Sequence, residues 1–103
     1  MECEIYEPAS GEILVGTEFN VFKGIKNIGH KRAITPYEPT YLNDLLFEMG
    51  LPGVHLGDEY GWGPREIVED IEIYVEPTIN DITKRKLLIL HYLFPPHPIF
   101  ELF

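Results

Sequence analysis

The segment from Thr78 to Phe94 constrains the fold more than any other part of the chain. From Leu87 to Phe94 only His91 interrupts an apolar run, and two prolines follow it. Thr78 suits the N-cap of a helix, and Asp81 three residues later makes an acidic variant of the capping box. The leucines and the charged lead-in favour a helix buried on most sides, around which the rest of the domain packs. A buried strand over Leu87 to Phe94 is the alternative.

The N-terminal third predicts β-structure. Glu2–Glu7 and Glu12–Val15 are extended segments joined by a turn at Pro8-Ala9-Ser10-Gly11, which predicts a hairpin. Glu18–Phe22 alternates weakly between polar and apolar residues, Gly24–Gly29 has the composition of a loop, and His30–Tyr37 is a further extended segment.

The middle of the chain predicts two helices. Glu38-Pro39-Thr40 opens a helix that runs to about Met49 and is capped by Gly50. A glycine-rich loop from Pro52 to Gly63 follows, and Pro64 then begins a helix over 64–75, with a strand over Ile71–Val75 as the alternative. The first helix carries its apolar stripe at Leu42, Leu45, Leu46 and Met49.

These elements predict an α+β fold. The 103 residues form a single domain, 1–103, in which an N-terminal antiparallel β-hairpin or sheet is followed by two or three helices packed around a buried C-terminal helix. Apolar residues make up 45% of the chain, which is enough for one core.

The sequence also predicts a soluble, cytoplasmic protein. Its single cysteine, Cys3, excludes an internal disulfide and favours a reducing compartment. The N-terminus has no charged segment followed by an apolar run, and the longest apolar stretch is shorter than the roughly 18 residues of a membrane span.

The charges are strongly acidic and lie in blocks. The net charge is −9, and residues 36–83 hold eleven acids against Arg65 alone. The bases lie in a block from Lys23 to Arg32, expected to be a solvated loop, and at 84–86. This balance attracts a cationic partner and opposes direct contact with nucleic acid or an anionic membrane.

No motif for chemistry stands out. The loop carries metal-capable groups at His55, Asp58 and Glu59, which His30, His91 or His97 would have to complete, but the paired spacings of zinc sites are missing. Ser10 and Cys3 lack the sequence context of a nucleophile. The sequence therefore predicts no metal, no cofactor and no enzyme.

The acidic stretch is the stronger candidate for function. On a helix over 64–75, Glu66, Glu69 and Asp70 lie at i, i+3 and i+4, where their mutual repulsion is relieved by a cationic partner. A merely solvated acidic face is the alternative. Tyr60 and Trp62 lie between glycines beside these acids and suit a binding hot spot, with a core position for Trp62 as the alternative. The expected partner-binding residues are Asp58, Glu59, Tyr60, Trp62, Glu66, Glu69 and Asp70.

Residues 47–75, with an acidic, tyrosine-containing loop followed by a proline and an Ile-Val segment, resemble the last two helices of immunity proteins against DNase bacteriocins. The resemblance covers less than a third of the 103 residues, and the β-rich N-terminus departs from that all-helical fold. The sequence predicts a small acidic inhibitor, an immunity protein or a phage-encoded antagonist, that occludes a basic, nucleic-acid-binding protein such as a nuclease. The alternative is a structural or adaptor subunit that docks through the apolar tail at Ile99, Phe100, Leu102 and Phe103.

Overall fold

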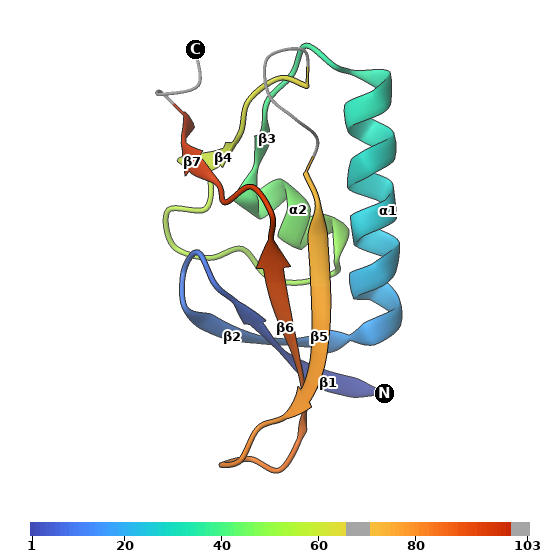
Figure 1. Cartoon of the computed structure of the whole chain (residues 1–103), viewed down its shortest axis with the longest axis vertical. Helices are drawn as coiled ribbons and strands as arrows, with labels where there is room; N and C mark the ends of the chain where they lie inside the picture. The colour runs from blue at the N-terminus through green and yellow to red at the C-terminus, as the bar shows by residue number, and fades with distance from the viewer. Residues whose placement is uncertain (66–70, 100–103) are drawn as a thin grey trace.

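The computed structural model describes residues 1–65 and 71–99, which form two β-sheets and two helices (Figure 1). The larger sheet has the strand order β2-β1-β6-β5, and the smaller one has the order β3-β4-β7. This arrangement confirms the α+β class.

The larger sheet consists of β1 (Glu2–Glu7), β2 (Glu12–Thr17), β5 (Ile73–Ile79) and β6 (Lys86–Tyr92). The smaller sheet consists of β3 (Thr40–Tyr41), β4 (Tyr60–Trp62) and β7 (His97–Pro98). The helices are α1 (Glu18–Ile34) and α2 (Leu42–Glu48).

The N-terminal hairpin is confirmed. β1 and β2 pair antiparallel, with Ile5 opposite Leu14 and Glu7 opposite Glu12, so the turn is the predicted Pro8–Gly11 segment. Because side chains alternate along a strand, Cys3, Ile5 and Glu7 share one face of β1, and all three are buried.

The predicted helix over Thr78–Phe94 is wrong, and a strand takes its place. β6 runs parallel to β1 and antiparallel to β5, with Leu88 and Leu90 fully buried and His91 exposed. Leu88 and Leu90 face the core, whereas Leu87 and Ile89 lie half-buried on the opposite face. Because both faces of the strand carry apolar side chains, the sequence does not show the period of two. The strand alternative is confirmed for Lys86–Tyr92.

A hairpin turn replaces the expected start of that helix. The Asn80 side chain accepts hydrogen bonds from the backbone N–H groups of Ile82 and Thr83, at 2.9 and 3.4 Å. Asparagine is a common turn residue because its side chain can cap the backbone in this way. The residues from Asp81 to Arg85 therefore connect two strands and do not open a helix.

The predicted helix over 64–75 is wrong at its C-terminal end, where Ile73–Ile79 form β5. Residues 66–70 lie outside the described residues. β5 contains Pro77 and lies at the edge of the sheet. An edge position tolerates proline because the missing N–H need not bond to a second neighbouring strand.

The expected strands and loop between Glu18 and Tyr37 are wrong as well, because Glu18–Ile34 form the longer helix, α1. Thr17 caps it by accepting a hydrogen bond from the Asn20 N–H at 3.2 Å. Gly24 lies inside the helix against α2, and a Cβ built there would meet the Glu48 carbonyl at 2.6 Å. Glycine serves here for a close helix contact and not for a turn. Arg32 of the basic block is buried, whereas Lys23 is exposed.

The predicted helix from Glu38 to about Met49 is confirmed as α2, although it begins at Leu42 and not at Glu38. Gly50 has a positive φ of 69° directly after the helix, as expected for a helix end. The stripe Leu42, Leu45, Leu46 and Met49 is buried in one core with Val21 and Ile28 of α1 and with Ile5, Leu88 and Leu90 of the large sheet. Neither helix in the described ranges combines the length and the apolar composition that a membrane-spanning helix requires.

Candidate binding site

The loop between α2 and β4 is anchored on the buried side chain of Asn43. Its Oδ1 accepts a hydrogen bond from the Val54 N–H at 2.8 Å, and its Nδ2 lies 3.2 Å from Asp58 Oδ1. The Asn43 N–H donates to the Gly57 carbonyl at 3.0 Å. A side chain from the first turn of α2 therefore fixes the path of the loop and the position of the Asp58 carboxylate.

Three of the predicted contact residues come together at the end of this loop. Asp58, Glu59 and Tyr60, called here the acidic segment, are all exposed, with Tyr60 38% accessible. Tyr60 begins β4 opposite Pro98 of β7, and the Ile99 N–H donates to the Glu59 carbonyl at 2.9 Å. The small sheet thus fixes the segment from the other side.

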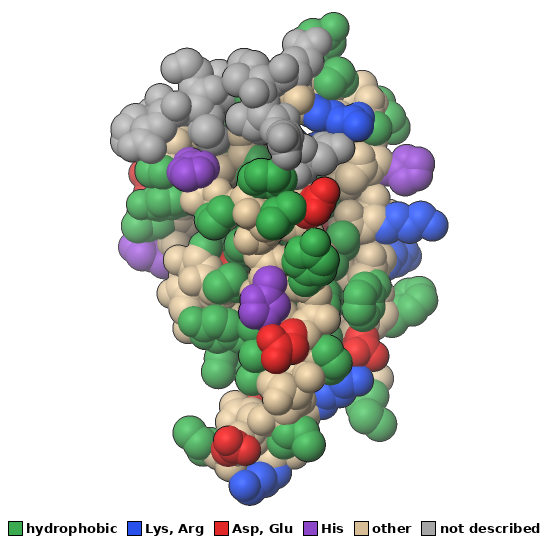
Figure 2. Space-filling view, in the orientation of Figure 1, with side chains coloured by type: hydrophobic (Ala, Val, Ile, Leu, Met, Phe, Trp, Pro, Cys, Tyr) green, Lys and Arg blue, Asp and Glu red, His purple; other side chains and the backbone are tan. Residues whose placement is uncertain are grey.

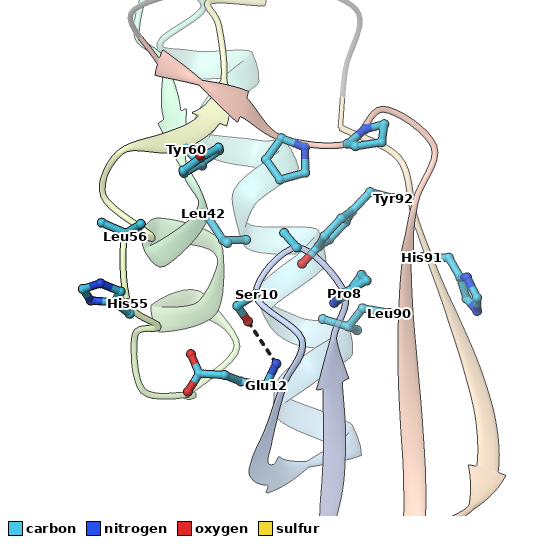
Figure 3. A pocket seen from close by; sticks show the side chains of 13 residues that line it. Pro8, Ser10, Glu12, Leu42, His55, Leu56, Tyr60, Leu90, His91 and Tyr92 are labelled. Carbon is cyan, nitrogen blue, oxygen red and sulfur yellow. Dashed lines mark hydrogen bonds between the residues drawn. The ribbon is translucent and has the colours of Figure 1, made fainter.

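A cavity of about 710 Å³ opens beside the acidic segment. Its walls come from the β1–β2 turn, the α2–β4 loop and the chain after β6, which lie far apart in the sequence. Figure 3 shows Tyr60 and Tyr92 directed into this space, whereas His91 points to the opposite side of β6. The rest of the apolar lining consists of Pro8, Ala9, Leu42, Leu56, Leu90, Pro95 and Pro96.

Leu56 carries an unusual backbone conformation at this site. Its φ is +63°, a value that residues with a Cβ rarely adopt. Turn hydrogen bonds hold it, from Gly57 N to the Val54 carbonyl at 3.1 Å and from Glu59 N to the Leu56 carbonyl at 2.9 Å. Such conformations occur preferentially at functional sites, where the surrounding structure maintains them.

A buried carboxylate lies behind the cavity wall. Glu7 is 0% exposed and accepts a hydrogen bond from the Tyr92 hydroxyl at 2.5 Å. The backbone N–H groups of Ala9 and Ser10 donate to it at 3.0 and 2.6 Å. Burial of the phenol, reinforced by the neighbouring Glu7, raises the pKa of Tyr92 far above its ordinary value of about 10. Tyr92 therefore stays a hydrogen-bond donor throughout the physiological pH range.

Trp62 belongs to the core and not to the exposed surface. It is 3% exposed, its ring meets Tyr92 edge-on at 5.5 Å, and its Nε1–H donates to the Phe94 carbonyl at 2.5 Å. This is the alternative position that the sequence offered for Trp62, and it removes the residue from the set of surface anchors. The remaining predicted contacts, Glu66, Glu69 and Asp70, lie outside the described residues.

The metal-capable groups do not converge. Within residues 1–65 and 71–99, no three His, Cys, Asp or Glu side chains are placed so as to hold a metal ion. His55 and His91 both belong to the residues that line the cavity, and the His91 ring contacts Glu76 at 2.8 Å.

The charges are segregated around the site. Figure 2 shows lysine and arginine along the α1 side and at the tip of the β5–β6 hairpin, and none on the side of the α2–β4 loop in that view. Among the described residues that line the cavity, none is lysine or arginine, and Glu12 is the acid at its rim. The described lining thus combines the Glu12 carboxylate with His55 and His91, and the acidic segment adds two exposed carboxylates beside it.

Sequence reasoning missed the Glu7–Tyr92 pair and the cavity. The alternation along β1 places Glu7 on the same face as Cys3 and Ile5, which was a usable signal for a buried acid. No comparable signal exists for the cavity, because its walls meet only in the folded chain.

No family model, curated protein or solved structure matches this chain significantly.

Proposed function

We propose that the protein is a small acidic inhibitor that binds a basic protein and occludes the surface with which that partner contacts nucleic acid. The observation that carries the proposal is the exposed acidic segment, Asp58-Glu59-Tyr60, whose Tyr60 lines a cavity with no lysine or arginine in its described lining. The net charge of −9 acts in the same direction.

The anchoring of the acidic segment supports a binding role. Asn43 and the β4–β7 pairing hold the segment in the free protein, which reduces the ordering that binding would require. Exposed carboxylates accelerate encounter with a cationic surface, and a tyrosine beside them supplies contact area with few rotatable bonds. Inhibition of this kind needs only steric and electrostatic occlusion and no chemical step.

Immunity proteins and phage-encoded antagonists of host nucleases both fall within this class. A cytoplasmic location, where such targets meet nucleic acid and where Cys3 stays reduced, belongs to the same proposal.

The test begins with affinity capture from the source cells and continues with stopped-flow kinetics on the partner identified. In the double variant Asp58→Asn/Glu59→Gln, we expect association to be roughly three- to tenfold slower at low salt, with a weaker salt dependence. The substitutions keep side-chain size, and the amide oxygen introduced at position 58 can still accept the hydrogen bond that Asn43 donates.

The matched control is Glu38→Gln/Asp81→Asn, which changes the net charge equally at two other exposed sites. It should bind like the unmodified protein. Equal association rates for the two double variants would show that the acidic segment is only solvated surface, and the inhibitor proposal would fall.

A structural or adaptor subunit is the second candidate, and a different observation favours it. β2 lies at one edge of the large sheet, and Ile13 and Val15 on it are 50% and 46% exposed. Sheet edges with exposed apolar side chains are sites of association. Of the apolar tail, Ile99 lies within the described residues and lines a small groove beside Tyr60. If Ile13→Lys disrupts a complex that light scattering detects, while Asp58→Asn/Glu59→Gln does not, the adaptor function is the correct one.

A further inference from the structure

The cavity beside the acidic segment selects ligands by charge. Glu12 lies at its rim, and the carboxylate of Glu7 is buried behind the wall formed by Tyr92 and the β1–β2 turn. The Glu7 side chain accepts hydrogen bonds from the Ala9 and Ser10 N–H groups and from the Tyr92 hydroxyl. With Glu12 at the rim and no lysine or arginine among the described lining residues, the cavity offers a carboxylate to a cationic group.

The walls of the cavity suit a side chain that is both apolar and cationic. Tyr60 and Tyr92 line the space from different elements, and Leu42 of α2 forms part of its wall (Figure 3). A cation over a tyrosine ring is attracted by the negative face of the ring, and a long basic side chain packs its aliphatic stem against apolar surface. An aliphatic side chain would use the walls but leave Glu12 without a partner.

The size of the cavity fits part of a protein chain. Its volume of about 710 Å³ falls in the range of about 300–1,000 Å³ that is typical of ligand sites, and it accommodates a short peptide segment with its side chain.

We propose that this cavity receives an arginine side chain of the basic partner, with its stem between Tyr60 and Tyr92 and its guanidinium group paired with Glu12. Arginine fits better than lysine because its planar, weakly hydrated guanidinium group stacks on aromatic rings and pairs with a carboxylate through two hydrogen bonds. The inference rests on the proposed inhibitor function and deepens it, since it names the group that fixes the partner beside the acidic segment.

Binding can be measured with the peptide Ac-Ala-Arg-Ala-NH₂ and ¹⁵N-labelled protein. Trp62 is the only tryptophan, so its indole N–H gives a single signal. The ring contacts Tyr92 edge-on but does not line the cavity, so it reports on the wall without touching the ligand. We expect saturable shifts of this signal and of the amides at 9–12 and 55–60, with a Kd on the order of 1 mM.

Three comparisons test the chemistry. The citrulline peptide, which keeps the shape but loses the charge, should bind about tenfold more weakly or worse, and the lysine peptide should also bind more weakly. Glu12→Gln should weaken arginine-peptide binding about two- to fivefold, as expected for one partly exposed charge pair. Glu38→Gln, an equal charge change outside the cavity, should leave binding unchanged.

Equal binding of the arginine and citrulline peptides would overturn the inference, as would shifts that avoid the cavity or equal binding of the lysine peptide. The proposed function fails separately. If the arginine peptide does not bind but Asp58→Asn/Glu59→Gln still slows the partner, the inhibitor stands and the arginine pocket falls. If the peptide binds as expected and the double variant has no effect on the partner, the inhibitor function falls.

Discussion

At the scale of single residues, the hydrogen bond between Tyr92 and Glu7 ties the C-terminal strand to the first one. The contact spans 85 positions in the sequence and is partly buried. Removal of the hydroxyl leaves the buried Glu7 carboxylate with its two backbone donors only. Because a buried charged acceptor that loses a donor is destabilising, we expect Tyr92→Phe to lower the free energy of unfolding by about 1–3 kcal/mol.

The same residue predicts a dependence on alkaline pH. The pKa of Tyr92 is raised in the folded state, so its contribution to stability is fully present below the unfolded value of about 10 and is lost as pH rises above it. The loss is about 1.4 kcal/mol per pH unit, because only the unfolded chain releases the proton there. Urea unfolding at several pH values should therefore show the difference between the unmodified protein and Tyr92→Phe shrinking above pH 10. Tyr37→Phe, at an exposed tyrosine, is the control and should change neither stability nor slope.

Cys3 is predicted to be unreactive in the folded protein. It is 3% exposed, and burial, followed by the nearby Glu18, raises the pKa of its thiol. Both effects reduce the thiolate that attacks disulfide reagents. Labelling with a chromogenic disulfide should be slow in buffer and rapid in denaturant. Equally rapid labelling under both conditions would contradict the burial of the N-terminal strand.

At the scale of elements, the contact between α1 and α2 depends on Gly24. Any side chain there meets the backbone of Glu48 and Met49 at 2.6 Å, whereas a Cβ at Gly29 of the same helix meets no atom within 4 Å. Gly24→Ala must therefore push the helices apart, and we expect it to destabilise the protein by about 1–3 kcal/mol. Gly29→Ala should stabilise it by about 0.5–1 kcal/mol, because alanine has the higher helix propensity.

Thermal or urea unfolding of the two variants measures this difference directly. Each replaces a glycine of α1 by alanine, so intrinsic propensity is matched and only the packing differs. Similar stabilities for both would mean that the helices do not approach as closely at Gly24 as described here.

At the scale of the whole molecule, the core is predicted to need no metal. It is built from buried apolar side chains of both helices, of β1, β2 and β6 in the large sheet and of β4 in the small one, together with adjoining loops, and β5 packs against it. A chain of 103 residues is long enough for one core without a structural ion. The melting temperature should be the same with and without a strong chelator. A drop of many degrees on chelation would point back to the loop that carries His55 and Asp58.

The mistaken elements have physical causes at identifiable residues. Gly24 and Gly29 suggested a loop because glycine is rare in helices, but the first serves helix packing and the second is simply exposed. The leucines of β6 suggested a helix because apolar side chains lie on both faces of this strand, so the period of two is hidden in the sequence. Asn80 and Pro77 did carry the correct signals, a turn and an edge strand.

By itself the sequence determined the features that depend on neighbours a few residues apart or on totals. These are the first hairpin with its Pro8–Gly11 turn, the buried stripe of α2, the helix end at Gly50, the α+β class and the net charge of −9. Turn geometry, helical spacing and charge are local or additive properties, so they can be obtained without the fold.

Only the tertiary structure decided the features that depend on what each residue meets across the chain. Trp62 became a core residue because Tyr92 and the Phe94 carbonyl lie against it, and Glu7 became a buried acceptor because the Tyr92 hydroxyl reaches it. The cavity exists because the turn after β1, the loop before β4 and the prolines after β6 are brought together. Burial and cavity shape are set by contacts between distant segments, and the spacing of residues along the chain does not encode which segments will meet.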